Sequence, residues 1–426
     1  MAGGGLGGAP ALRDGDLLGP DNWQAARGLL PDEILEHYRL GEYRNRFVDV
    51  RRADLRPITL PPDLAQASRA NRDRYALDER GSIVELATGK RPSRIFGFPF
   101  PDIEVNDPQA GIKVMWNNLY LSYYRGDSRF LTDVVMLGQR GVERQIRTDV
   151  MMRMYDGSPE SAERANPDDL LMQTIARVVA PADLQGTNTL TWRYRAGDRP
   201  DALWSYVPGL RRPRQVNPLN RSDGFLGSDV SLDDGPFFDG KPESFEFRLL
   251  GRQEMLVLVD PFGVTNDVDI VPAPGGGWRT VWKDVPRLGA EERGWKGVPW
   301  APVSAVLGLR PVWVVEAVPR DRNYLYGRIV MRIDAETYRG AWSSKYDRAG
   351  TLMVSYQVSS GVWDSLDGGK SWIPSGGIAI QTAENHMYKR ATAMLFPPRD
   401  PRNPADYRIP SDPDDFAMDV LVRAGK

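Results

Sequence analysis

The alternation that decides the fold class lies in residues Asn323–Asp334, which read NYLYGRIVMRID. Apolar side chains fall on one side of an extended chain there, namely Leu325, Ile329, Met331 and Ile333. Tyrosines and arginines fall on the other side. Because side chains of a β-strand alternate between its two faces, this period of two predicts a strand with one buried face. Residues 352–358 repeat the pattern.

Similar short runs surround this strand, at residues 190–195, 202–207, 244–250, 254–259, 312–318 and 386–396. Asp-Gly pairs at 223–224, 239–240 and 367–368 suit the tight turns of hairpins. No long helical pattern separates these runs. We therefore expect a meandering antiparallel sheet with one face packed and the other face available.

Helical patterns occur only in the first 180 residues. Two short pieces are expected between Gly19 and Tyr43, the second opening at Pro31 and ending at Gly41. His37 lies off the apolar face of that piece, so we expect it at the surface. Further helical patterns cover residues 110–124 and 167–179. Prolines break the chain in between, which predicts an N-terminal arm, residues 1–84, that wraps a β-dominated domain, residues 85–426.

The composition excludes several kinds of chemistry. The 426 residues include 55 Lys and Arg against 57 Asp and Glu, so there is no basic surplus of the kind that nucleic-acid binding needs. There is no cysteine and there are two histidines, which excludes thiol catalysis, disulfides and multi-histidine metal sites. We expect no metal and no cofactor. The longest weakly charged stretch, residues 297–309, is far shorter than the roughly 20 apolar residues of a membrane-spanning helix.

Two stretches look like known motifs but have structural interpretations. Residues 365–372, SLDGGKSW, fit an Asp box with Ser in place of Thr. A β-propeller would repeat this box at about 40–50 residues, whereas only a partial second copy occurs at 231–238, so we predict a single hairpin. Gly369-Lys370-Ser371 lacks the first glycine of a phosphate loop, because that position is Asp364. The adjacent Asp233 and Asp234 are expected in a solvated turn.

Aromatic side chains and arginines gather between residues 192 and 214, on two predicted strands and the turn that follows them. An aromatic strand face that ends in arginines can hold an apolar body and fix an anionic head group. A packed core beside a solvated basic turn would use the same residues, so both interpretations stay open. The candidate ligand-binding residues are Trp192, Tyr194, Trp204, Tyr206, Arg211, Arg212 and Arg214.

Several short motifs carry a family resemblance when they are taken together. They are GPDNW at 19–23, LPDEILEHY at 30–38, FPFP at 98–101, WSYVPGLRR at 204–212, FDGK at 238–241, FEFRLLG at 245–251 and VWVVEA at 312–317. From about residue 19 to 396 the chain resembles a family of Gram-negative periplasmic proteins described as outer-membrane lipoprotein-sorting-protein-like. That family has a half-barrel of the LolA and LppX type and no established catalytic residues.

The resemblance implies a mainly β (α+β) fold, in which an incomplete antiparallel β-barrel wraps over helices and leaves an apolar cavity. It also implies a periplasmic protein whose signal peptide is missing from this chain, acting beside RND-type transporters and outer-membrane channels. We therefore expect a carrier of a lipid or other hydrophobic molecule and not an enzyme. An adaptor of a transporter assembly without its own ligand, and an enzyme using carboxylates and tyrosines, are the alternatives.

Overall fold

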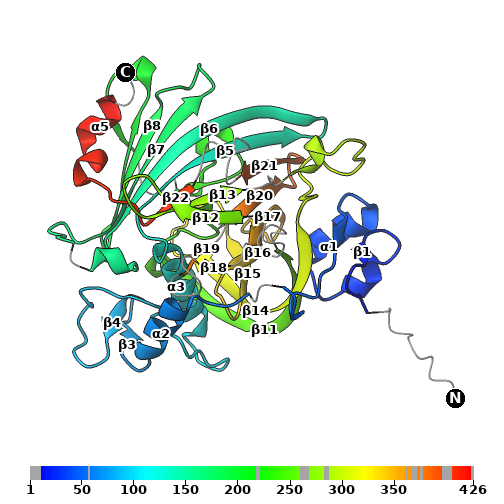
Figure 1. The fold of residues 1–426 in the computed structure, drawn as a ribbon, viewed down its shortest axis with the longest axis horizontal. Helices are drawn as coiled ribbons and strands as arrows, with labels where there is room; N and C mark the ends of the chain where they lie inside the picture. The colour runs from blue at the N-terminus through cyan, green and yellow to red at the C-terminus, as the bar shows by residue number, and fades with distance from the viewer. Residues whose placement is uncertain are drawn as a thin grey trace.

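The structure, a computed structural model, describes residues 11–55, 58–162, 164–216, 221–259, 268–282, 287–360, 363–365, 372–374, 378–395 and 405–423. Strands predominate over helices in these ranges (Figure 1). Four α-helices are described, α1 (Asp32–Leu40), α2 (Pro62–Ala70), α3 (Ala110–Tyr123) and α5 (Met418–Arg423). None of the helices in the described ranges has both the length and the apolar character needed to cross a bilayer.

One 16-stranded sheet dominates the described chain. Its first half is formed by β5 (Ser128–Gly138), β6 (Gly141–Met154), β7 (Leu170–Ala180), β8 (Asn188–Tyr194), β9 (Ala202–Tyr206) and β10 (Arg214–Val216). Its second half is formed by β11 (Phe245–Val259), β14 (Val306–Pro319), β15 (Arg328–Asp334), β16 (Gly340–Tyr346), β17 (Leu352–Ser360), β20 (Ile378–Asn385) and β21 (Arg390–Leu395). Three short strands lie off this path, namely β12 (Val268–Pro272), β13 (Trp278–Trp282) and β22 (Ala405–Tyr407).

The strands run in the order β10-β9-β8-β7-β6-β5-β21-β20-β17-β11-β14-β15-β16. Neighbours are antiparallel, apart from a single parallel bridge between Val259 and Ser360 that joins β11 to β17. The second half curls round, since β17 also pairs with β16, whereas β10 leaves the other end open. The sheet as a whole is therefore antiparallel and does not close into a barrel, which confirms the predicted fold class.

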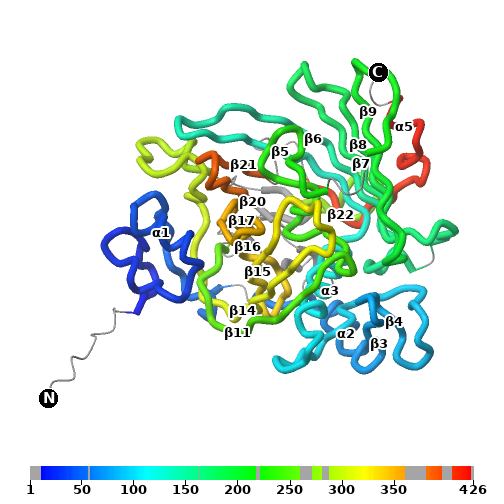
Figure 2. The backbone as a smooth tube through the Cα atoms, turned by 180° about the vertical axis from the view of Figure 1, so that it is seen from behind, coloured from blue at the N-terminus to red at the C-terminus, as the bar shows by residue number. Residues whose placement is uncertain are grey.

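The N-terminal segments pack against this sheet at two separate places (Figures 1 and 2). Helix α1 buries Ile34, Leu35 and Tyr38 in a cluster with residues of β11, β14 and β20, and it ends at Gly41, whose φ of 74° is left-handed. Helix α2 lies near α3, together with the hairpin of β3 (Tyr75–Leu77) and β4 (Ile83–Glu85). Helices α1 and α2 thus contribute to the same hydrophobic clusters as the strands.

Helix α3 is buried on almost every side, because the curled half of the sheet wraps around it. Val114, Met115 and Leu119 are fully buried in the main cluster. Gly111 allows the start of α3 to approach β11, since a Cβ at that position would meet the Arg248 backbone at 3.0 Å. The helix predicted over residues 110–124 is confirmed, and it supplies the central packing surface of the molecule.

Three local predictions were wrong, and one helix was missed. The segment predicted as a helix at 167–179 forms strand β7 from Leu170 onward, and helix α2 was not anticipated. His37 is buried, and its ring lies between Glu42 and Glu384 at 2.7 Å from each. Asp233 and Asp234 are also buried, because a short 3-10 helix (Leu232–Asp234) carries them into the interior. These polar side chains are buried because the fold places oppositely charged partners beside them. The sequence alone does not show which residues become partners.

Other predictions concern segments that the structure describes only in part. The predicted runs at 244–250 and 254–259 are one long strand, β11, with a register shift between Leu249 and Gly251. Strands β18 (Trp363–Ser365) and β19 (Trp372–Pro374) pair as the Asp-box hairpin requires, while its turn, residues 366–371, lies outside the described residues. The division of the chain at residue 85 stays a prediction.

Candidate ligand cavity

A cavity of about 240 Å³ lies on one side of the long strands β5 to β8. Its floor is the inner face of those strands, and its roof is formed by the end of α3 and by residues 221–239. A single water molecule needs only about 10–15 Å³ of such space. The cavity is therefore large enough for an organic molecule.

The alternation of the strands decides which side chains reach this cavity. Paired residues of antiparallel strands share a face, so the pairs Ser128–Met152, Met152–Thr174 and Thr174–Thr191 place one row of side chains across four strands. All of these residues line the cavity. The opposite face of the same strands looks away from it.

Most of the lining is apolar. The floor carries Phe130, Val134, Val150, Met152, Met154, Met172 and Ala176, and the roof carries Phe225, Val230, Leu232 and Pro236. Methionine side chains are flexible and polarisable, so they adapt to ligands of irregular shape. The three methionines of the floor come from adjacent strands, and their side chains form its most adaptable part.

Hydroxyl groups interrupt this apolar surface along the strands. Thr132, Thr148, Thr174, Thr189 and Thr191 line the cavity together with the amide of Gln381. The Thr132 and Thr174 hydroxyls are buried and have no hydrogen-bond partner among the described residues. Buried polar atoms are normally bonded, which makes this lining unusual for a part of a sealed core.

A buried network of ion pairs anchors the roof to the sheet. Arg193 of β8 lies 3.0 Å from Asp201 and 2.7 Å from Asp239, and Arg221 lies 2.6 Å from Asp233. Lys241 lies 3.6 Å from Asp201 and is the third cation of the network, so that three cations face three carboxylates. Burial alone would raise the pKa of Asp201, but the neighbouring cations, Arg193 first, hold this pKa below its usual value. The roof residues 221–239 are thus fixed electrostatically.

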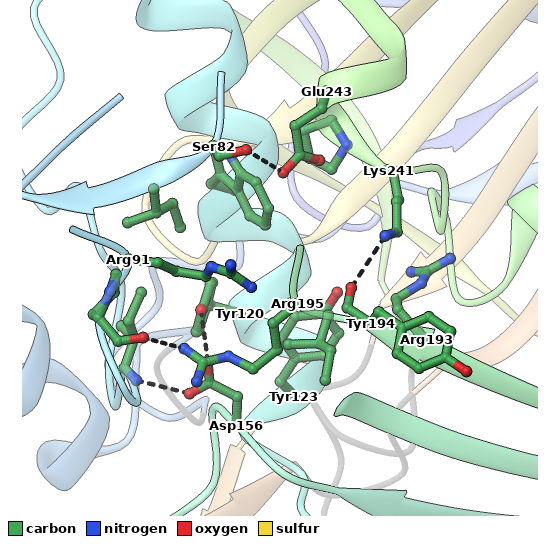
Figure 3. A pocket seen from close by; sticks show the side chains of 16 residues that line it. Ser82, Arg91, Tyr120, Tyr123, Asp156, Arg193, Tyr194, Arg195, Lys241 and Glu243 are labelled. Carbon is green, nitrogen blue, oxygen red and sulfur yellow. Dashed lines mark hydrogen bonds and ion pairs between the residues drawn. The ribbon is translucent and has the colours of Figure 1, made fainter. Parts of the chain in front are cut away.

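A second, much smaller pocket of about 40 Å³ lies where the N-terminal arm meets the sheet (Figure 3). Its polar groups point toward one another. Ser82 donates to Glu243 at 2.9 Å, Tyr120 donates to Asp156 at 3.2 Å, and Arg195 lies 3.3 Å from Asp156. Because these groups satisfy each other, the pocket serves as an attachment point for the arm.

Three of the four aromatic residues predicted from the sequence lie together, but on the face of the sheet that looks away from the cavity. Trp192 and Trp204 meet edge to face with ring centroids 5.3 Å apart, and the Trp192 indole donates to the Phe416 carbonyl at 3.1 Å. Tyr206 is buried in the same cluster, which α5 covers. Tyr194 lines the small pocket instead, with the Arg199 guanidinium 3.3 Å from its ring centroid.

The predicted arginines lie at the open end of the sheet. Arg211, Arg212 and Arg214 are all exposed, and Arg214 belongs to the edge strand β10. None of the seven predicted residues lines the large cavity among the described residues. Their role in ligand binding stays a prediction, and a ligand held by them would lie outside this cavity.

Sequence reasoning found only β8 among the four strands of the floor; it missed β5 and β6 and expected a helix in place of β7. The signal was present as the alternation of Thr148, Val150, Met152 and Met154 in β6. Because one of these inward-facing residues is a threonine, the apolar alternation of the strand was harder to recognise. The buried roof acids gave no signal at all, because their partners lie far away in the sequence.

Similarity to solved structures is weak in sequence and moderate in shape. A domain described as an outer membrane lipoprotein-sorting protein, from Vibrio parahaemolyticus, has 16% identity and a TM-score of 0.49, covering 74% of this chain and 100% of that chain. A DUF1329 family protein from Desulfovibrio piger has 15% identity and a TM-score of 0.48, with the same two coverages. A LolA superfamily protein from Nitrosomonas europaea has 12% identity and a TM-score of 0.40, covering 71% of this chain and 97% of that chain.

No curated protein matches the chain. The profile of a family of proteins of unknown function, DUF1329, matches residues 21–393. This match spans nearly all of the segment that carries the motifs singled out above, and it confirms the resemblance that those motifs indicated. The chain therefore belongs to the DUF1329 family.

Proposed function

We propose that this protein is a periplasmic carrier that shields a lipid or other hydrophobic molecule in the cavity whose floor is formed by β5 to β8. The observation that carries the proposal is a cavity of about 240 Å³ with mostly apolar walls. Protein cores are close-packed, and empty apolar space costs stability of about 20–30 cal/mol per Å³. An apolar ligand that fills the cavity recovers that cost.

The energetics of such a ligand are favourable. Each CH₂ group that leaves water contributes about 0.8 kcal/mol before the costs of ordering the chain. The methionines of β6 and β7 can adjust to different chain shapes. These properties suit a carrier that accepts a class of hydrophobic molecules. The periplasmic location, and service to an RND-type transporter or an outer-membrane channel, rest on the resemblance drawn from the sequence motifs.

An adaptor without its own ligand is the second candidate. Met387 and Tyr388 are 60% and 72% exposed at the turn between β20 and β21, and large apolar side chains at a hairpin tip suit contact with another protein. An adaptor would need these residues and would not need an open cavity.

Mass spectrometry of lipids extracted from the natively purified protein separates the two candidates. A carrier is expected to retain a hydrophobic molecule in amounts comparable to the protein, and protein that has been unfolded, washed and refolded is the control that should lack it. Absence of such a molecule, together with failure of the refolded protein to take up any apolar probe, would contradict the carrier and favour the adaptor.

A further inference from the structure

Arg125 is a cation in the cavity that has no anionic partner. It follows the last turn of α3, is partly buried, and lines the cavity together with Ser122, Gly126 and Ser128. Among the described residues, no carboxylate lies within ion-pair distance of its guanidinium, and no side chain or carbonyl accepts a hydrogen bond from it. Arg193 and Arg221, by contrast, each contact two or more carboxylates.

Even a partly buried arginine without a counter-charge is costly, because its guanidinium loses part of its hydration. Burial lowers the pKa of Arg125, which means that its surroundings disfavour the charge. The guanidinium nevertheless keeps its proton at neutral pH, because the pKa of arginine starts above about 12. Its five donors are therefore present in the cavity, ready for an acceptor that the described protein does not supply.

The polar groups around Arg125 define one end of the cavity. Tyr407 of β22 pairs with Ser128 at the start of β5, and both line the cavity. Burial raises the pKa of the Tyr407 phenol, which keeps this hydroxyl neutral and able to donate. From Ser128, strand β5 runs along the floor to Val134, a distance of roughly 20 Å at about 3.3 Å per residue. The cavity thus has a cationic group at one end, and mostly apolar side chains line it from there along β5.

We infer that the cavity selects amphiphiles with an anionic head group, a carboxylate or a phosphate, which pairs with Arg125 while the hydrocarbon chain lies along β5 toward Val134. This inference rests on the proposed carrier function and specifies its ligand. The planar guanidinium can bond two oxygens of either head group at once. The Ser122 and Tyr407 hydroxyls lie at the same end and can donate to the remaining oxygens.

Competition binding tests the inference with three probes of equal chain length, dodecanoate, dodecyl phosphate and dodecanol. Each displaces N-phenyl-1-naphthylamine, an uncharged fluorophore, from the refolded protein. We expect wild-type protein to bind at least one of the two anions about tenfold or more tightly than dodecanol, since hydrogen bonds to charged groups are the strong ones. The carboxylate and phosphate arms show which head group fits better. The preference should shrink as salt is added.

The variants isolate the guanidinium. Arg125→Gln should lose the preference for the anions and bind dodecanol within about twofold of wild type, whereas Arg125→Lys should retain part of the preference. Arg129→Gln is the matched control. Arg129 pairs with Asp149, Asp149 lies on the face of the sheet opposite the cavity, and the control removes the same charge four residues away. Arg125→Met should also melt at or above the wild-type temperature without ligand, because it removes an unpaired buried charge.

The outcomes distinguish this inference from the carrier function itself. Equal affinity of Arg125→Gln and wild type for all three probes would overturn the role of Arg125 and leave the carrier standing. Failure of wild type to bind any probe would overturn both. A comparable loss in Arg129→Gln would show that the net charge of the protein, and not a site, produces the preference.

Discussion

Arg193 Nη1 lies 2.7 Å from Asp239 Oδ1, and this ion pair joins strand β8 to the roof of the cavity. Arg193 also holds Asp201, and its side chain is almost completely buried. A buried pair contributes little compared with an apolar pair of the same size, but breaking it leaves a charge stranded in the interior. Removing one partner of this network should therefore destabilise the roof of the cavity strongly.

Replacing Arg193 tests this anchoring. We expect Arg193→Met to lose about 3–5 kcal/mol of unfolding free energy, because Asp201 and Asp239 remain buried without this partner. Urea unfolding followed by tryptophan fluorescence measures the loss. Arg144→Met is the control, since Arg144 and Asp183 form an ion pair at 2.9 Å in which both side chains are exposed, and its loss should cost about 1 kcal/mol or less. Similar losses in both variants would mean that the network does not hold the roof.

His37 should make the docking of α1 depend on pH. Burial alone would lower the pKa of His37, but hydrogen bonds and charges from Glu384 and Glu42 outweigh it and raise the pKa to about 9. A folded-state pKa above the unfolded value of 6.5 means that the folded protein binds the extra proton. The stabilisation, up to about 3 kcal/mol, is complete below pH 6.5 and is lost as pH rises through about 9.

Unfolding free energies measured at intervals from pH 6 to 10 check this behaviour. Wild type should lose stability across the window between the two pKa values. His37→Gln should start less stable and show a flatter profile, because it lacks the titrating ring. Parallel profiles for the two proteins would show that the pH dependence comes from other groups.

The exposed arginines 211, 212 and 214 offer a rival location for an anionic head group. If Arg125 holds the head group, the triple alanine variant should keep its melting temperature and bind dodecanoate as wild type does. Exposed charges contribute little to folding, so the comparison isolates binding. A several-fold weaker affinity in the triple variant would instead support the site predicted from the sequence around Trp192 and Trp204.

The sequence predicted the antiparallel sheet from the alternation of residue types in strands such as β15. Ile329, Met331 and Ile333 are buried in the main cluster there, and Arg328 and Arg332 are only partly buried. Val330, on the same face as the arginines, is buried as well. Strand β7 was mistaken for a helix because both of its faces are covered. Met172 faces the cavity while Ile175 packs beneath α5, and apolar residues on both faces erase the period of two.

The candidate site was less predictable than the fold. Trp192 and Trp204 are diagonal neighbours on one face of β8 and β9, but what covers that face is α5, which comes more than 200 residues later. Arg125 has no local motif at all. What singles it out is the lack of a counter-charge among the described residues, and only a three-dimensional arrangement reveals that.

Filling the cavity tests the carrier function most directly. Ala176 lies on its floor, and Val179 is exposed on the same strand. Titration with N-phenyl-1-naphthylamine should give saturable binding to wild type and to Val179→Trp. Ala176→Trp should bind at least about tenfold more weakly while keeping a folded circular dichroism spectrum, because the indole occupies the space of the ligand. Equal binding by Ala176→Trp and Val179→Trp would contradict the account.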